Sequence, residues 1–284
     1  GYVKLPSLGI FELDEVANAL QEQYLPRFSG DVLPLSQTGS SLALADRVDV
    51  LIGIFGINQK PTGVKDPFQL RRASLGIIRI LIDGNYNLDL ETLLQKSLTT
   101  FIVELENKNV VSDVRQFIFD RFYVYLTSSL NLRADVVKAV FAEQSNSLLK
   151  DLLKRGQALQ PFVESDEAIK LIQGFKRVSN ILKGADLSEV KDLEVVPELF
   201  QIEEEKALYQ AMQNEQQVVS ELLLKQEYQA LLISLARLKD SVDNYFEKVM
   251  VNVDDVAIKQ NRLKLLMQLH KLFNKFADLA LIQG

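Results

Sequence analysis

The chain has 284 residues, of which 47% are hydrophobic, and a formal net charge of −6 at pH 7. It has no cysteine and one histidine, so disulfides, cysteine-bound zinc and metal sites built on two histidines are excluded within one chain. No apolar run reaches the roughly 18 uncharged residues that a membrane span needs. We therefore expect a cytoplasmic protein without a membrane segment.

The pattern of apolar residues predicts an all-α fold. Few residues break helices, no alternating strand pattern stands out, and apolar positions recur at helical spacing. The expected helices cover residues 14–24, 41–55, 67–82, 89–105, a stretch from about 113, 133–143, 148–159, 165–183, 203–224, 228–251 and 255–282. The polar stretch 108–112 marks a boundary between two domains, 1–108 and 109–284. Because the chain begins with Gly-Tyr-Val rather than Met, we expect it to be part of a longer protein.

The expected helix over residues 41–55 is apolar on nearly all sides, which predicts a buried helix. Its Arg47 would then need a partner, and a nearby carboxylate is the simplest one. We therefore expect an ion pair for Arg47 in the core of the first domain.

A basic loop leads into the expected helix over residues 67–82, and Asp66 is in position to cap that helix. Five basic residues and one acid lie between residues 60 and 79, although the whole chain is acidic. Such an excess is typical of a polyanion contact, and a loop before a helix start is a general anion site. The candidate RNA-binding residues here are Lys60, Lys65, Arg71 and Arg72. Two alternatives stay open: nucleotide binding, which the absent P-loop pattern disfavours, and pairing of Arg71 and Arg72 with acids of a neighbouring helix.

The expected helix over residues 165–183 carries a second basic group. Four basic residues and no acid lie between residues 170 and 183, and Gln173 offers an amide that can contact base edges. The candidate RNA-binding residues are Lys170, Lys176, Arg177, Asn180 and Lys183. Phe175 could stack on a base, but we favour a position in the core.

The last expected helix carries a third basic group. Lys264, Lys271 and Lys275 lie opposite its apolar face, so they are candidates for phosphate contact, and an ordinary solvated face is the alternative. Arg262 falls on the apolar side with the acids Asp254 and Asp255 just upstream, which favours an ion pair or a cap. For the only histidine, His270, we favour a helix position at the edge of a packed face. The carboxylates of residues 203–205 suit a helix start and are not expected to be catalytic.

Several strings resemble a known family. Residues 44–80, LADRVDVLIGIFGINQKPTGVKDPFQLRRASLGIIRI, resemble the beta subunit of the bacterial two-subunit glycyl-tRNA synthetase. The second part resembles the helical anticodon-binding domain often called the DALR fold, in the strings FDRF (119–122), FKRVSNILK (175–183), VDNYFEKVMVNVDD (242–255) and NRLKLL (261–266). The resemblance implies a degenerate HD-like helical region over 1–108, truncated at its N-terminus, followed by a DALR-like helical bundle over 109–284.

The resemblance also implies a function. The chain would position tRNA(Gly) for aminoacylation by a separate catalytic alpha subunit, in an alpha2beta2 enzyme that uses ATP and magnesium. We expect no catalytic residue, cofactor or metal in this segment. Asp46 could stand at a metal position of HD domains, but no His-Asp doublet exists and Gln23 replaces the expected histidine. The alternatives are a subunit-assembly module without RNA contact and a degenerate HD phosphohydrolase.

Overall fold

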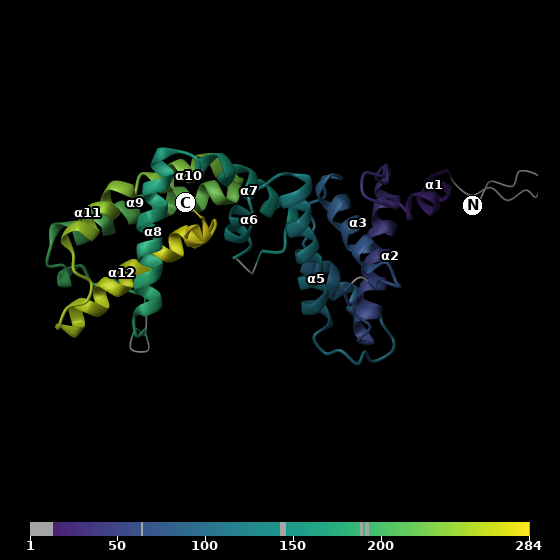
Figure 1. Cartoon of the computed structure of the whole chain (residues 1–284), viewed down its shortest axis with the longest axis horizontal. Helices are drawn as coiled ribbons and strands as arrows, with labels where there is room; N and C mark the ends of the chain where they lie inside the picture. The colour runs from purple at the N-terminus through teal and green to yellow at the C-terminus, as the bar shows by residue number, and fades with distance from the viewer. Residues whose placement is uncertain (1–13, 64, 143–145, 188–189, 191–192, 284) are drawn as a thin grey trace, which may run out of the picture. The chain divides into compact units, whose positions relative to one another are not determined.

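The computed structural model describes residues 14–63, 65–142, 146–187, 190 and 193–283, and these residues are mostly helical (Figure 1). Among them, the single β contact outside the helices is an isolated bridge between Thr62 and Lys65. The predicted all-α helical fold is therefore confirmed. No helix in this part of the chain is both long and apolar enough to cross a bilayer.

The contacts divide the chain into two compact units. Unit 1 comprises Gly1–Asn131 and Ser147–Lys150, and unit 2 comprises Leu132–Asn146 and Asp151–Gly284. The domain boundary near residue 108 stays a prediction. The packing nevertheless groups helix α5 (Val110–Val124), which follows residue 108, with the helices before that residue.

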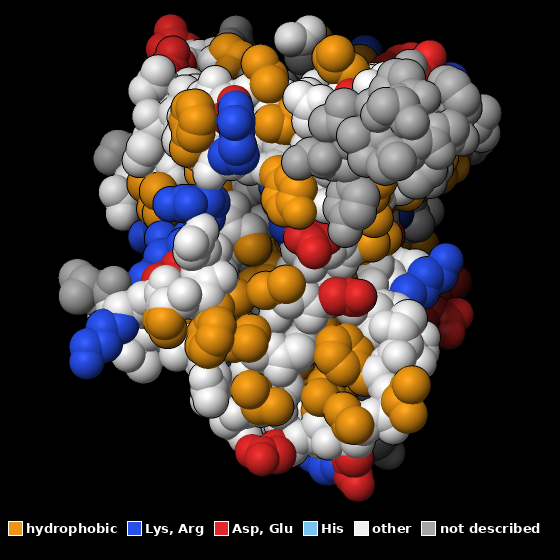
Figure 2. Space-filling view, turned by 90° about the vertical axis from the view of Figure 1, so that its right-hand side faces the viewer, with side chains coloured by type: hydrophobic (Ala, Val, Ile, Leu, Met, Phe, Trp, Pro, Cys, Tyr) orange, Lys and Arg blue, Asp and Glu red, His pale blue; other side chains and the backbone are white. Residues whose placement is uncertain are grey.

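Unit 1 is built around one central helix. Its helices are α1 (Asp14–Glu22), α2 (Gln37–Gly56), α3 (Leu70–Ile82), α4 (Leu90–Leu98) and α5 (Val110–Val124), and α5 continues into the π-helical turn Tyr125–Ser129. Helix α2 begins at the N-cap Ser36, whose hydroxyl accepts the Gly39 N–H, and it contacts the other four helices. Several hydrophobic side chains on this unit are exposed, among them Tyr24, Phe28 and Phe68. Figure 2 shows a face on which such side chains lie beside Lys and Arg side chains.

Within the described residues, no carboxylate hydrogen-bonds the buried Arg47, although Asp46 next to it attracts its charge. Its Nη1 donates to the carbonyls of Gln23 (2.9 Å) and Ala43 (2.8 Å), and its Nη2 donates to the carbonyl of Pro26 (3.1 Å). The expectation of an ion pair was wrong because backbone carbonyls in the segment after α1 and within α2 already satisfy the guanidinium. Gly76 of α3 makes room for this side chain, since a Cβ there would lie 2.4 Å from Arg47 Nε.

We predict that Gly76→Ala lowers the free energy of unfolding by about 1–3 kcal/mol, the usual cost of overpacking a core. The matched control is Gly53→Ala in α2, where the nearest atom to a new Cβ is in Phe101, at 3.4 Å. That substitution is expected to be neutral or stabilising, because alanine is the better helix former. Urea denaturation of both variants measures the difference. Equal stability of the two variants would contradict the close packing of α3 on Arg47.

Unit 2 is a second bundle of helices. They are α6 (Ala134–Phe141), most of α7 (Leu149–Phe162), α8 (Asp166–Gly184), α9 (Glu203–Lys225), α10 (Tyr228–Ala236), α11 (Lys239–Lys248) and α12 (Val256–Asn274), with 3-10 turns at Pro197–Leu199 and Leu279–Leu281. Helix α9 contacts α10, α11 and α12, and α8 contacts the same three helices. The expected helix over 228–251 is divided into α10 and α11. The expected helix over 255–282 ends at Asn274, and the turn after it packs against α6 and α8.

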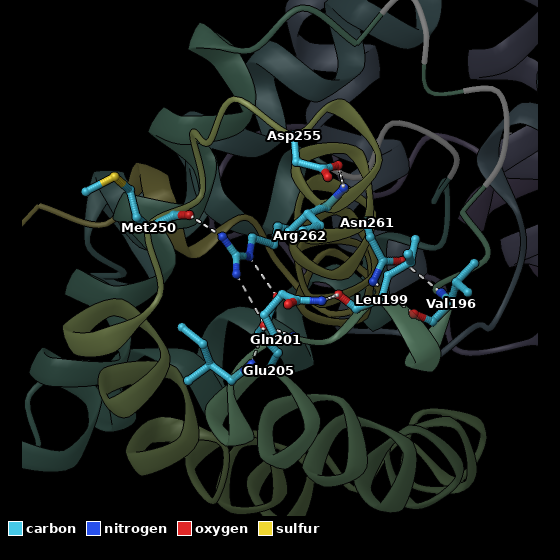
Figure 3. A network of polar contacts seen from close by, with 10 residues as sticks. Val196, Leu199, Gln201, Glu205, Met250, Asp255, Asn261 and Arg262 are labelled. Atoms are coloured by element: carbon cyan, nitrogen blue, oxygen red, sulfur yellow. Dashed lines mark hydrogen bonds and ion pairs between the residues drawn. The ribbon is translucent and has the colours of Figure 1, made fainter.

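A buried ion pair joins α9 to α12 (Figure 3). Glu205 is 0% exposed and Arg262 is 5% exposed. Arg262 Nε lies 2.7 Å from Glu205 Oε1, and Arg262 Nη1 donates to the carbonyl of Met250 at 2.8 Å. The second carboxylate oxygen of Glu205 accepts the N–H groups of Gln201 and Ile202, so the same side chain caps α9. The predicted ion pair of Arg262 is confirmed, with an acid distant in the sequence as its partner.

Neighbouring polar side chains extend this network. Asn261 makes two hydrogen bonds with the backbone of Val196: its Oδ1 accepts the N–H at 2.8 Å and its Nδ2 donates to the carbonyl at 3.0 Å. Asp255, which the sequence placed near Arg262, instead accepts the Ile258 N–H and caps α12. These contacts anchor the first turns of α12 and the segment before α9.

We predict that Arg262→Ala lowers the free energy of unfolding by about 3–5 kcal/mol, because it leaves the Glu205 carboxylate buried without its partner. The control is Lys271→Ala in the same helix, an exposed position where the change is expected to stay within about 0.5 kcal/mol. Urea denaturation followed by circular dichroism measures both. If Arg262→Ala costs no more than Lys271→Ala, the ion pair does not hold the bundle together.

Candidate nucleic-acid interface

Helix α8 presents one polar face to solvent. Ser165 caps its start by accepting the Ala168 N–H, and Leu171, Phe175 and Val178 are buried. At 100° per residue, the opposite side chains share one face, and all four are exposed: Lys170, Gln173, Arg177 and Asn180. Three candidate RNA-binding residues, Lys170, Arg177 and Asn180, thus lie with Gln173 on one accessible surface of the helix. Lys183 is exposed on the flank of this face, and Lys176 is half-buried there.

Arg177 also has a structural contact. Its guanidinium carbon lies 4.4 Å from the centre of the Phe246 ring, in the range of a cation–π interaction. Substitution of Arg177 would therefore disturb packing against α11 as well as surface charge. Lys170 offers the cleaner test of charge on this face.

The aromatic residues of α8 and α12 form part of the core. Phe175 stacks on His270 with ring centres 5.2 Å apart and lies 5.0 Å from the Phe273 ring, so its predicted core position is confirmed. Burial lowers the pKa of His270, which favours the neutral imidazole. His270 lies half-buried beside these rings, as predicted, and no catalytic arrangement surrounds it among the described contacts.

A groove of about 460 Å³ lies between α9 and α12. Its lining residues are Leu193, Met212, Gln213, Gln216, Gln268, Lys271, Leu272 and Lys275. Lys275 Nζ donates to Ser220 Oγ at 3.1 Å, and Gln268 Nε2 donates to the Leu193 carbonyl. No acid lines the groove among the residues that the structure describes, so Lys271 and Lys275 give it a local positive charge.

Two features place the lysines in this groove. Lys271 and Lys275 are four residues apart, so they lie on one side of α12. Arg155 fixes the end of that helix, because its Nη1 donates to the carbonyls of Lys275 and Phe276, each at 2.9 Å. Lys264 lies on the same side but is half-buried and does not line the groove.

Sequence analysis missed the amides of the groove. Gln213, Gln216 and Gln268 supply groups that can hydrogen-bond base edges, while lysines contact phosphates irrespective of base. The position of Gln268 three residues before Lys271 was a usable signal. The two glutamines of α9 had none, because only the packing of α9 on α12 brings them to the lysines.

The basic candidates of unit 1 have other contacts. Lys60 Nζ lies 2.6 Å from Asp113 Oδ2, Arg71 donates to the Gly63 carbonyl, and Arg72 Nη1 donates to Gln69 Oε1 at 2.8 Å. Lys65 is exposed. Among the described contacts, neither arginine pairs with an acid of a neighbouring helix, so that alternative was wrong. RNA contact by these four residues stays a prediction.

The start of α3 holds its own anion. Asp66 Oδ1 accepts the Leu70 N–H at 2.8 Å and Oδ2 accepts the Arg71 N–H at 3.0 Å. The capping role of Asp66 is confirmed, although α3 begins at Leu70 rather than Pro67, because Gln69 has a φ of 57°. The carboxylate occupies the place that a ligand phosphate would take.

In the described part of the chain, no group of three or more Asp, Glu, His or Cys lies close enough together to hold a metal ion.

We predict that Lys170→Gln and Lys271→Gln each lower the slope of log K against log salt for tRNA binding by about 0.7–0.9, the value for one lost phosphate contact. The matched control is Lys248→Gln in the same unit, because Glu204 already neutralises that ammonium group. Filter binding at several salt concentrations measures the slopes. An equal change in the control, or none in the two test variants, would show that these lysines are only solvated surface.

Comparison with known proteins agrees with the resemblance. Residues 11–142 match the family model described as glycyl-tRNA synthetase beta subunit, and residues 171–283 match the DALR anticodon binding domain. The groove between α9 and α12 lies within the second match.

Curated relatives match almost the whole chain. It is 45% identical over 272 residues to the glycine–tRNA ligase beta subunit of Actinobacillus pleuropneumoniae serotype 7, a match that covers 96% of the chain and 39% of the relative. It is 42% identical over 269 residues to the protein of that name from Methylobacillus flagellatus, with 94% and 37% covered. For Coxiella burnetii the identity is 43% over 267 residues, with 94% and 38% covered. The chain thus spans less than two fifths of the length of these relatives. From these matches, it belongs to the glycyl-tRNA synthetase beta subunit family and carries a DALR anticodon-binding domain over residues 171–283.

Proposed function

We propose that this chain is the tRNA-holding part of a two-subunit glycine–tRNA ligase, and that unit 2 binds the anticodon side of tRNA(Gly). The observation that carries the proposal is the groove between α9 and α12, where three amides and two lysines lie together and no acid is among the described lining residues. Single-stranded RNA loops are read by hydrogen bonds to base edges, and lysines bind the adjoining phosphates.

The acidic total charge does not oppose RNA binding. At physiological salt, charges further away than about 8 Å are largely screened, so the local surface decides the field that a phosphate meets. The exposed face of α8 carries Lys170 and Arg177, and the groove carries Lys271 and Lys275. A nucleic acid on unit 2 would therefore meet positive charge next to hydrogen-bonding amides.

Bond formation belongs, in this proposal, to a separate alpha subunit that uses ATP and magnesium, within an alpha2beta2 enzyme of the cytoplasm. The relatives' name, beta subunit, supports a second kind of subunit. Within this chain, the sole histidine stacks in the core and the start of α3 is filled by Asp66. The role of the chain is then to bind and orient the tRNA.

One observation favours a second candidate function, a subunit-assembly module without RNA contact. Ile102 and Val103, in the segment between α4 and α5, are 102% and 69% exposed. Exposed apolar side chains of this kind suit a protein partner. The degenerate phosphohydrolase has no such support, since Gln23 stands in place of the histidine and Asp46 is exposed without a metal-binding group around it in the described residues.

We predict that the chain binds tRNA(Gly) at about 150 mM salt, and that Gln213→Ala with Gln216→Ala reduces its preference for tRNA(Gly) over other tRNAs. Loss of one base contact is expected to cost about 1–3 kcal/mol of discrimination. The matched control is Gln217→Ala, an exposed residue of α9 that bonds Glu221 and does not line the groove. Competition filter binding measures the preference.

Three results would contradict the proposal. Absence of tRNA binding at this salt concentration would favour the assembly module. An equal effect of Gln217→Ala would remove the groove from recognition. Formation of glycyl-tRNA by the chain alone, with ATP and glycine, would refute the division of labour between subunits.

A further inference from the structure

Unit 1 has a groove of its own, about 380 Å³ in volume, between the segment after α1, the middle of α2 and the start of α3. Its walls include two aromatic side chains that solvent reaches: Tyr24 is 64% exposed and Phe68 is 42% exposed. The amides of Gln23 and Gln69 lie in the same lining. Exposed aromatic rings next to amides form a surface that can stack and hydrogen-bond a flat polar ligand.

The groove also contains two arginines whose hydrogen bonds go to neutral groups, although Asp46 attracts the charge of Arg47. Arg72 donates to the neutral amide of Gln69, and Arg47 donates to three backbone carbonyls. Arg27 lines the groove too, but Asp31 pairs with it at 2.9 Å. Asp46 is the one acid among the lining residues that the structure describes. The balance favours a ligand that is aromatic and negatively charged.

We propose that this groove binds an unpaired nucleotide of an RNA strand, with the base on Tyr24 and Phe68 and a phosphate at Arg72. Aromatic rings beside arginines are the usual means of holding single-stranded RNA, because every base has a face that can stack. A protein partner would not need the exposed positive charge of Arg72. The proposal extends the proposed function to unit 1, and rests on it for the view that the chain binds RNA.

A phosphate-bearing nucleobase could also come from a free nucleotide. The shared chemistry is a base that stacks with a phosphate nearby, and the length of the ligand separates the two sources. A strand offers phosphates on both sides of the stacked base, whereas a mononucleotide offers one. A strand is therefore expected to bind more tightly and with a stronger dependence on salt.

The chain has no tryptophan, so Phe68→Trp introduces a single fluorescent reporter into the groove. We expect a single-stranded adenosine octamer to quench this fluorescence, and adenosine monophosphate to require at least tenfold higher concentration. In the same background, Tyr24→Ala is expected to weaken the octamer about tenfold, in line with the loss of one stacked base. Arg72→Gln is expected to weaken it and to lower the salt slope.

Two controls isolate the groove. Phe28→Ala removes another exposed aromatic residue of unit 1 that does not line the groove, and it should leave the quench unchanged. Lys271→Gln acts on the groove between α9 and α12, and it should also leave the quench unchanged. Anisotropy of a labelled octamer with Tyr24→Ala, in a chain that keeps Phe68, provides a readout independent of the introduced tryptophan.

The proposal is overturned if the octamer neither quenches the folded Phe68→Trp variant nor loses affinity with Tyr24→Ala. It is equally overturned if adenosine monophosphate binds as well as the octamer, or if Phe28→Ala has the same effect as Tyr24→Ala. Loss of the quench with Lys271→Gln would show that the octamer depends on the groove between α9 and α12, and would overturn an independent site in unit 1. The octamer could quench the fluorescence as expected while Lys170→Gln and Lys271→Gln leave tRNA binding unchanged. That result would support the groove of unit 1 and contradict only the proposed role of unit 2.

Discussion

The buried ion pair between Glu205 and Arg262 is the interaction on which unit 2 depends. It joins the first turn of α9 to α12, and these two helices form the walls of the groove with Lys271 and Lys275. Two charges can be buried only if hydrogen bonds satisfy them, and here both carboxylate oxygens and the guanidinium have partners. Burial beside this pair raises the pKa of the Tyr245 hydroxyl, whose oxygen has no hydrogen-bond partner among the described residues. The pair thus ties α9 to α12 inside the bundle.

The helices could be predicted from the spacing of apolar residues, but several of their ends could not. The expected helix over 228–251 is interrupted between Ala236 and Lys239, and its pattern gave no sign of this because both pieces bury residues at similar spacing. The start of α3 differs because a turn precedes Leu70, although Asp66 still satisfies the first N–H groups. Arg47 shows the same limit, since its carbonyl partners depend on how the segment after α1 folds back.

The sequence predicted the charged residues of the candidate site. It did not predict the residues that only helix packing brings to the site. Lys271 and Lys275 follow from helical spacing on one helix, whereas Gln213 and Gln216 come from a second helix that is distant in the sequence. The same reason explains why Lys60 was grouped with neighbouring cations, although Asp113 of α5 lies beside it. Local charge is visible in a sequence, but its neutralisation depends on tertiary contacts.

The central claim is that α8 and the groove between α9 and α12 hold the anticodon side of a tRNA. Hydroxyl-radical footprinting of tRNA(Gly) with the chain tests it most directly. The account predicts protection of the anticodon loop that disappears when Lys170, Lys271 and Lys275 are all changed to glutamate in a folded protein. Protection confined to other parts of the tRNA, or an anticodon footprint that survives these changes, would contradict it.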